Sequence, residues 1–535
     1  MKTKRQYILN SLLLTAVALL MRTVSVSFNV YVSNRVGAEV MGLLALVSSV
    51  YGFAVTLATS GIQLATVRTL AERLEQTGGA DTKRCLRACL AYAAFFGTLA
   101  TILLCALSAP IGIYALKEIR TVRALRMLSF TLLPISLCSV MNGYFTAVRR
   151  AWKNALVQVT EQAVKITLTG YLLVIVAPRT VEGSMLAILL GGAVSESISL
   201  LFNVLLYLFD KHRRLCTNSQ KYGTRIHVAK IALPVAVSAY MRSGLLAIEH
   251  ALIPRGLKKF GAGSAAALAA YGALHSMALP VVLYPAALLS SFASLLIPEV
   301  TEQQSANNRT EITYIAGRVY QMTLLFAIGT AGVMLCLSGE LGEVLYHSSE
   351  VARFIGALAP IVPIMYLDTA TDAMLKGLGQ QVYSMNINIL DASISVVAVA
   401  LLVPRLGING YLVTIYITEL FNASLSISRL LKITGFRPSL FSLVGRPLLA
   451  VVGATSILRI LFTLLPMGIT NTPQGLVLHI LVAVFLYLAL LFLTGGFDRT
   501  DRKWLIDILF PSKPNVKKRQ FTHAYITNKK EEEYQ

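Results

Sequence analysis

Long apolar segments follow one another along almost the whole chain and limit what it can fold into. A helix needs about 20 apolar residues to cross a hydrocarbon core of about 30 Å. Fourteen such segments can be drawn, over residues 8–32, 40–66, 86–109, 124–146, 155–177, 184–209, 226–253, 266–296, 312–338, 353–375, 382–403, 408–431, 443–464 and 474–494. With 55% hydrophobic and only 14% charged residues, the chain is too apolar for a soluble protein of this length. We therefore predict an all-α integral membrane protein with about 14 transmembrane helices.

Two arginines lie inside apolar segments at corresponding places in the chain. Arg22 and Arg242 each follow a methionine, and each is followed thirteen residues later by another arginine, Arg35 or Arg255. A charged side chain near the middle of a membrane is costly unless it faces a polar cavity. The repeat predicts two homologous halves around one cavity, with both arginines pointing into it. The alternatives are a structural pair inside the protein or a side chain that reaches the membrane interface.

The repeat extends beyond the arginines. At the same shift Asn29 falls on Glu249, and seven residues are close to two helical turns, so each shares a helix face with its arginine. An ion pair between Arg242 and Glu249 is the structural alternative. The repeat predicts two six-helix bundles that face each other in a V, as in transporters built from parallel repeats. The predicted parts are a first bundle at 1–210, a cytoplasmic linker at 211–225, a second bundle at 226–431, two extra helices at 432–494 and a cytoplasmic tail at 495–535.

The basic residues predict the orientation. Most Lys and Arg residues fall on the side of the N-terminus, and the positive-inside rule then places both termini in the cytoplasm. The net charge of +22 is explained by this topology and by anionic membrane lipids, so nucleic acid is not an expected partner. Residues 1–20 resemble a signal peptide, but the apolar run continues to residue 32, and we expect an uncleaved first helix. One loop on the other side carries basic residues at a spacing of three, which predicts either a solvated helix face or a face that meets phosphate groups: Lys117, Arg120, Arg123 and Arg126.

Other charged residues in the apolar segments are candidates for ion coupling. Glu161 and Lys165 are four residues apart with the acid first, which favours an ion pair on one helix and leaves a cavity role open. Asp368 and Asp372 have the same spacing and precede Lys376, so they form either a Na⁺ or H⁺ site or a paired helix end. Coupling to the membrane potential or to a Na⁺ or H⁺ gradient is the expectation, and the sequence does not choose between them.

The chain has no recognisable cofactor or metal motif. Its six cysteines are scattered, and no Gly-rich phosphate loop or large extramembrane catalytic segment is present in the sequence. Prolines inside the predicted spans mark bends, and they act either as hinges or as fixed kinks. The best hinge candidates are Pro280, Pro285, Pro360 and Pro363.

Several short motifs resemble a known family. They are GIQLAT at 61–66, LIPEV at 296–300, KGLGQ at 376–380 and VPRLGING at 403–410. Together they resemble the stage V sporulation protein B branch of the multidrug/oligosaccharidyl-lipid/polysaccharide exporter superfamily, over about residues 5–495. The superfamily also holds lipid II flippases and cation-coupled drug exporters. In the flippases, cavity arginines handle a lipid pyrophosphate, and these positions match Arg22, Arg35, Arg242 and Arg255, whereas Glu249 is a departure.

The resemblance and the residues together predict a flippase in the bacterial plasma membrane rather than an enzyme. An arginine suits a pyrophosphate head because its planar fork donates two hydrogen bonds and stays protonated. The expected substrate is a polyprenyl-pyrophosphate-linked sugar for cell wall or spore cortex synthesis, with cell wall synthesis machinery as a partner. Two alternatives stay open, a cation-coupled multidrug exporter and a non-transporting scaffold. The two extra helices are expected to pack on the outside and to form a groove for a lipid tail.

Overall fold

A computed structural model describes residues 2–77, 82–176, 180–212, 228–436, 438–439, 441–464 and 472–495. Residues 213–225 of the predicted linker and the tail from residue 496 lie outside the described residues. Every regular element in the described part is a helix, in agreement with the predicted fold class. The first half contains α1 (Lys2–Thr59), α2 (Ile62–Thr77), α3 (Thr82–Pro110), η1 (Ile111–Ala115), α4 (Thr121–Ser129), α5 (Leu132–Ala147), α6 (Ala151–Tyr171), η2 (Leu172–Val176) and α7 (Val181–His212).

The second half has more helix breaks than the first. It contains α8 (Val228–Phe260), α9 (Ser264–Gly272), η3 (Ala273–Ala278), α10 (Leu279–Leu283), α11 (Ala286–Ser305), α12 (Arg309–Cys336), α13 (Ser338–Tyr346), α14 (Ser349–Leu358), η4 (Ala359–Ile361), α15 (Val362–Gly377), α16 (Gln381–Leu406) and α17 (Ile408–Thr434). Two further helices follow, α18 (Arg446–Leu464) after the short η5 (Phe441–Gly445), and α19 (Pro473–Leu493).

The predicted count of fourteen spans is not confirmed. Among the described residues, nine helical stretches are long and apolar enough to cross a membrane, or ten if α4 and α5, which meet at a 44° bend, form one span. The first two predicted segments share α1, which continues through a break at Gly37 with φ 80° and ψ 170°, a conformation that glycine adopts without steric cost. The predicted span at 266–296 is divided among four shorter elements, and Pro285 lies in the turn just before α11.

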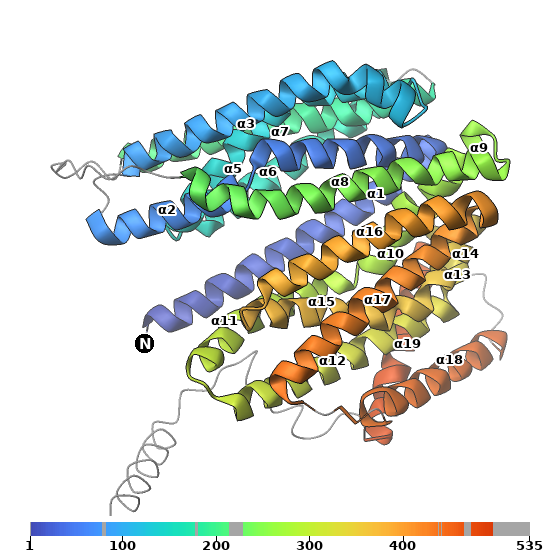
Figure 1. The fold of residues 1–535 in the computed structure, drawn as a ribbon. Helices are drawn as coiled ribbons and strands as arrows, with labels where there is room; N and C mark the ends of the chain where they lie inside the picture. Colours follow the sequence, from blue (N-terminus) through green and yellow to red (C-terminus); the bar gives the residue numbers. More distant parts are fainter. Residues whose placement is uncertain are drawn as a thin grey trace, which may run out of the picture.

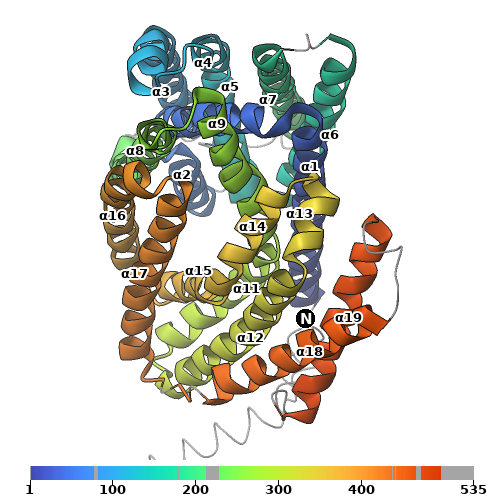
Figure 2. The same ribbon diagram turned by 90° about the vertical axis from the view of Figure 1, so that its right-hand side faces the viewer.

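The helices gather into two groups (Figure 1). In the first group, α3 packs on α5, and α6 packs on α7; in the second, α15 packs on α11, α12 and α17. Helix α8 lies between the groups, because it packs along α16 and also on α1 and α2. Helices α18 and α19 pack on each other and on α12, at one side of the second group (Figure 2).

Glycines bring the two groups together near α9. The Cα of Gly42, in α1, lies against the carbonyl of Leu268 in α9, and Gly272 lies against the carbonyl of Ala38. A Cβ atom at either glycine would collide with the facing backbone. The two groups are therefore in backbone contact at this end of the molecule, which we call the α9 end.

Candidate functional site

A polar cavity of about 660 Å³ lies where the first group meets α8 and η3. Helices α1, α6 and α7 form most of its wall. Its polar lining includes Asn29, Glu161, Gln162, Lys165, Glu196, His250, His275 and Ser276, together with several serines. A cavity of this size, polar and inside a membrane protein, is a candidate site for the polar part of a substrate.

Lys165 is the one lysine or arginine among the described residues that line this cavity. Glu161 lines it as well, but its carboxylate accepts a hydrogen bond from Ser199 of α7 at 2.9 Å. Neither an ion pair nor a hydrogen bond joins Lys165 to another described side chain. Glu161 and Lys165 therefore interact electrostatically without a direct ion pair, and the carboxylate is hydrogen bonded to Ser199 instead.

Residues of both groups meet at the cavity wall. The Asn29 amide donates a hydrogen bond to the backbone carbonyl of Ser276, in η3, at 3.2 Å. His250 of α8 and His275 of η3 lie with their ring centroids 4.4 Å apart, and the Tyr271 hydroxyl is 2.9 Å from Nδ1 of His250. Both histidines, like Glu196, are cavity residues to which the sequence assigned no function, since a lone polar residue in an apolar helix does not reveal its neighbours.

The two arginines of the sequence repeat do not line this cavity. Arg22 is exposed on α1 and makes no ion pair or hydrogen bond with the described residues. Arg242 is also exposed, on α8, where its guanidinium interacts electrostatically with Asp368 and Asp391. Arg35, beside the break at Gly37, is exposed as well.

Glu249 faces a different neighbour from Arg242. Its side chain is 7% exposed and hydrogen bonds to Ser395 of α16. Seven residues rise by about 10 Å along a helix, too far for a direct ion pair. The shared helix face therefore does not bring Arg242 and Glu249 together.

The two aspartates of α15 have different surroundings. Asp372 pairs with Lys376 at 2.8 Å and accepts a hydrogen bond from Ser384. Asp368 lies among the charges of Asp391 and Glu419, from α16 and α17. Across the described ranges, no group of histidines, cysteines and carboxylates has a geometry that could hold a metal ion.

The hinge candidates sit where helices break. Pro280 is the second residue of α10, and Pro285 precedes the first residue of α11. Pro360 lies in the 3₁₀ turn η4, and Pro363 lies in the first turn of α15. Their positions fit bends in the chain, and their role in movement stays a prediction.

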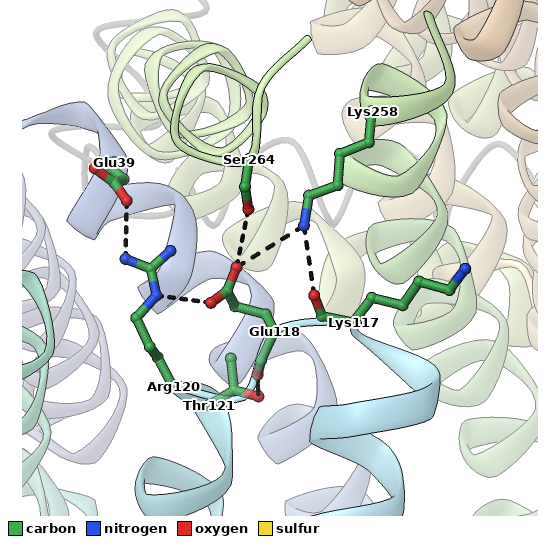
Figure 3. Close-up of polar contacts among 7 residues, drawn as sticks. All are labelled: Glu39, Lys117, Glu118, Arg120, Thr121, Lys258 and Ser264. Carbon is green, nitrogen blue, oxygen red and sulfur yellow. Dashed lines mark hydrogen bonds and ion pairs between the residues drawn. The ribbon is translucent and has the colours of Figure 1, made fainter. Parts of the chain in front are cut away.

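A carboxylate cluster occupies the α9 end of the first group. Glu118, in the segment between η1 and α4, accepts a hydrogen bond from Nε of Arg120 at 2.7 Å. Arg120 also pairs with Glu39 of α1 at 2.9 Å (Figure 3). Burial raises the pKa of Glu118, but the hydrogen bond from Arg120 and the charges of Arg120 and Lys258 outweigh burial, so the pKa lies below its usual value of 4.5. Glu118 is therefore ionised at neutral pH.

Helices α8 and α9 reach the same carboxylate. The Lys258 ammonium, in the last turn of α8, is 3.9 Å from Glu118 and donates a hydrogen bond to the carbonyl of Lys117 at 3.4 Å. The Ser264 hydroxyl, at the start of α9, donates to Glu118 at 3.2 Å (Figure 3). One turn before Lys258, the Arg255 guanidinium donates to the carbonyl of Tyr114.

The basic residues of the neighbouring helix α4 are paired within the protein. Arg123 pairs with Glu182 of α7 at 3.1 Å, and Arg126 donates a hydrogen bond to Ser108 of α3 at 3.0 Å. Lys117, Arg123 and Arg126 nevertheless keep exposed side chains, which agrees with a solvated face, and a face that meets phosphate groups stays a prediction.

A second cavity, of about 620 Å³, lies between the second group and α18. Its lining is almost wholly apolar and comes from α12, α15, α17 and α18, with Arg459 and Thr455 as polar members. An apolar cavity beside the two extra helices fits the expected lipid-tail groove.

Comparison with known proteins gives the family context. The family model described as polysaccharide biosynthesis protein matches residues 8–248. The stage V sporulation protein B of Bacillus subtilis (strain 168) is 24% identical over 414 residues, which cover 76% of this chain and 80% of that protein. The resemblance predicted from the motifs is confirmed.

Solved structures establish the fold. The lipid II flippase MurJ in an inward closed conformation matches 90% of this chain and 98% of its own, with a TM-score of 0.67 and 12% identity. A multidrug resistance MATE family transporter of the MOP superfamily, in an inward-facing conformation, matches 79% of this chain and 98% of its own, with a TM-score of 0.63 and 14% identity. The chain has the fold of the MOP-superfamily transporters. One of these two proteins is a flippase and the other a transporter, and the likeness shows a shared fold; nine or ten helical stretches of the described residues are long and apolar enough to cross a membrane.

Proposed function

We propose that this protein is a flippase that moves a polyprenyl-pyrophosphate-linked sugar from the cytoplasmic to the outer leaflet by alternating access. The observation that carries the proposal is the polar cavity between the two groups, whose one lysine, Lys165, makes no ion pair or hydrogen bond with a described side chain and has Glu161 and Glu196 as charged neighbours. A cation that no carboxylate holds in a direct ion pair is available to an anionic ligand. The resemblance to stage V sporulation protein B and the fold shared with MurJ support the same substrate class.

Arg22 and Arg242 act, in this proposal, on the path of the pyrophosphate head to and from the cavity. Both guanidiniums are exposed, and Arg22 has no partner among the described residues. The polyprenyl tail stays in lipid, and the apolar cavity beside α18 offers it a surface. Anionic lipids and cell wall synthesis proteins are the proposed partners, and the cytoplasmic position of both termini remains part of the proposal.

A cation-coupled multidrug exporter is the second candidate, and one observation favours it. The cavity contains two carboxylates, Glu161 and Glu196, against the single Lys165. An excess of acid suits a cationic ligand or a coupling ion better than an anionic head. For the flippase proposal, the same carboxylates, or Asp368 and Asp372, are the candidate sites of Na⁺ or H⁺ coupling.

Two assays in parallel separate these functions. The first is complementation of a bacterium depleted of its lipid II flippase, and the second is efflux of cationic dyes from a drug-sensitive host. We expect growth to be restored by the wild-type chain and lost with Lys165→Gln, without dye efflux. Efflux without complementation would reverse the ranking of the two functions.

A further inference from the structure

The two groups are joined at the α9 end by polar contacts that converge on one segment, residues 114–120. From the first group come Glu118 and its partner Arg120, which Glu39 holds from the other side. From α8, between the groups, comes Lys258, and from α9 comes Ser264; both reach the Glu118 carboxylate. Figure 3 shows the carboxylate at the centre of these contacts.

Glu118 is held in place by its own segment. Its backbone N–H donates to the carbonyl of Gly112 at 2.9 Å, and its backbone carbonyl accepts the Thr121 hydroxyl at 2.7 Å. The residue is 8% exposed, whereas Lys258 keeps 27% of its side chain exposed. The carboxylate is thus a fixed element of the first group, and the lysine is the part that can leave toward water.

Helix α8 is attached to this segment by two cations one turn apart. Arg255 donates to the Tyr114 carbonyl, and Lys258 donates to the Lys117 carbonyl as well as facing Glu118. The backbone contacts of Gly42 and Gly272 close the same end, but they supply no charge that could be exchanged with water.

We propose that Glu118, Lys258, Arg255 and Ser264 form a latch that holds the two groups together at the α9 end and must open in each transport cycle. The proposal rests on the alternating access of the proposed function. Basic residues in the sequence predict that this end faces outward, so the latch keeps the outer side closed while the cavity is loaded. When the groups separate, Arg120 and Glu39 stay with Glu118, so the carboxylate keeps a counter-charge and only Lys258 and Arg255 exchange protein oxygens for water. This arrangement makes the latch reversible, because no unpaired charge is left buried.

The latch is tested by a distance measurement that needs no substrate. Spin labels are placed at Ile119→Cys and Lys259→Cys, two exposed positions on opposite sides of the latch, in a cysteine-free background reconstituted in lipid nanodiscs. We expect one short distance in the wild-type background. Lys258→Gln and Glu118→Gln should each add a longer distance and raise its population several-fold, and Lys258→Arg should retain the short one.

Arg123→Gln is the matched control, because it removes an ion pair with Glu182 that lies wholly within the first group. It should leave the short distance unchanged. Unchanged distances in both Lys258→Gln and Glu118→Gln would overturn the latch. If Glu118→Gln does not fold, the result for Lys258→Gln decides alone. Lipid-linked sugar movement is measured separately on the same variants. If the label distance lengthens in the Lys258 and Glu118 variants but the wild type moves no lipid-linked sugar, the latch is supported and the proposed function is refuted. If the wild type moves the sugar but the distance does not change in these variants, the proposed function is supported and the latch is refuted.

Discussion

Glu118 and Lys258 lie 3.9 Å apart across the boundary between two helix groups, although 140 residues separate them in the chain. The carboxylate is nearly buried and paired with Arg120, so it is ionised before the lysine approaches. Opposite charges that are partly shielded from water attract more strongly than a surface pair. This relationship gives the α9 end a contact that depends on charge.

The separation of the groups should depend on pH in the acid range. The pKa of Glu118 lies below 4.5 in the closed state and returns toward its usual value when Lys258 leaves. Ionised Glu118 therefore favours closure above its usual pKa, and this contribution is lost as the pH falls through the lowered pKa of the closed state. The distance between labels at Ile119 and Lys259 should therefore be constant from about pH 7 to about pH 5 and lengthen below about pH 4. Glu118→Gln should remove this dependence. A transition near neutral pH would assign the effect to another group.

Gly272→Ala should prevent full closure at the α9 end. The added Cβ meets the backbone of Ala38 and Gly42, which cannot move without shifting the whole of α1. We expect a longer distance between the same two labels and a lower rate of transport. Gly339→Ala is the control, because nothing lies within 4 Å of its Cβ position. Normal closure in Gly272→Ala would mean that α1 and α9 separate easily.

Lys165→Gln should abolish transport with little loss of stability. The lysine is the one cation of the described cavity lining and has no ion pair there to lose. Lys165→Arg should retain part of the activity, since it keeps the charge and adds a second hydrogen-bond direction. Transport and thermal unfolding are measured together, with Lys259→Gln, an exposed lysine at the α9 end, as the control. Full activity of Lys165→Gln would remove the cavity from the proposed path.

Helix α19 should be attached to the second group through His479. Its ring is fully buried, and Nδ1 lies 2.6 Å from a carboxylate oxygen of Glu340 in α13. His479→Ala should reduce the free energy of unfolding by about 1–3 kcal/mol, the usual cost of leaving a buried polar group without its partner. Thermal unfolding in detergent measures the loss. Glu343→Gln, on the exposed side of α13, should unfold like the wild type, and an equal loss in both variants would argue against the pair.

The helical class and the family resemblance could be predicted because they depend on local patterns. Apolar segments and short motifs are visible in any window of the sequence, and the repeat of Arg22 and Arg242 predicted two related halves. The number of spans was harder, because a glycine break such as Gly37 does not end a helix and a turn before Pro285 divides one.

The contents of the cavity could not be predicted, because they depend on which faces of distant helices meet. A repeat shows that two residues are equivalent, but not that they face the same space, and Arg22 and Arg242 lie outside the lining. The spacing of Glu161 and Lys165 is visible in the sequence, but Ser199, which donates a hydrogen bond to Glu161, comes from another helix. The basic residue Arg120 was visible in the sequence, but its partners Glu39 and Glu118 became apparent only from the packing of α1 against the loop.

We propose that this protein moves an anionic lipid-linked sugar across the membrane with help from Arg22, Arg242 and Lys165. Purified protein in vesicles that contain a labelled polyprenyl-pyrophosphate sugar tests it most directly, by the fraction of sugar that an enzyme added outside can reach over time. We predict that the wild type raises this fraction well above that of protein-free vesicles. Lys165→Gln and the double variant Arg22→Ala/Arg242→Ala should not raise it. No rise with the wild type, or an equal rise with these variants, would contradict it.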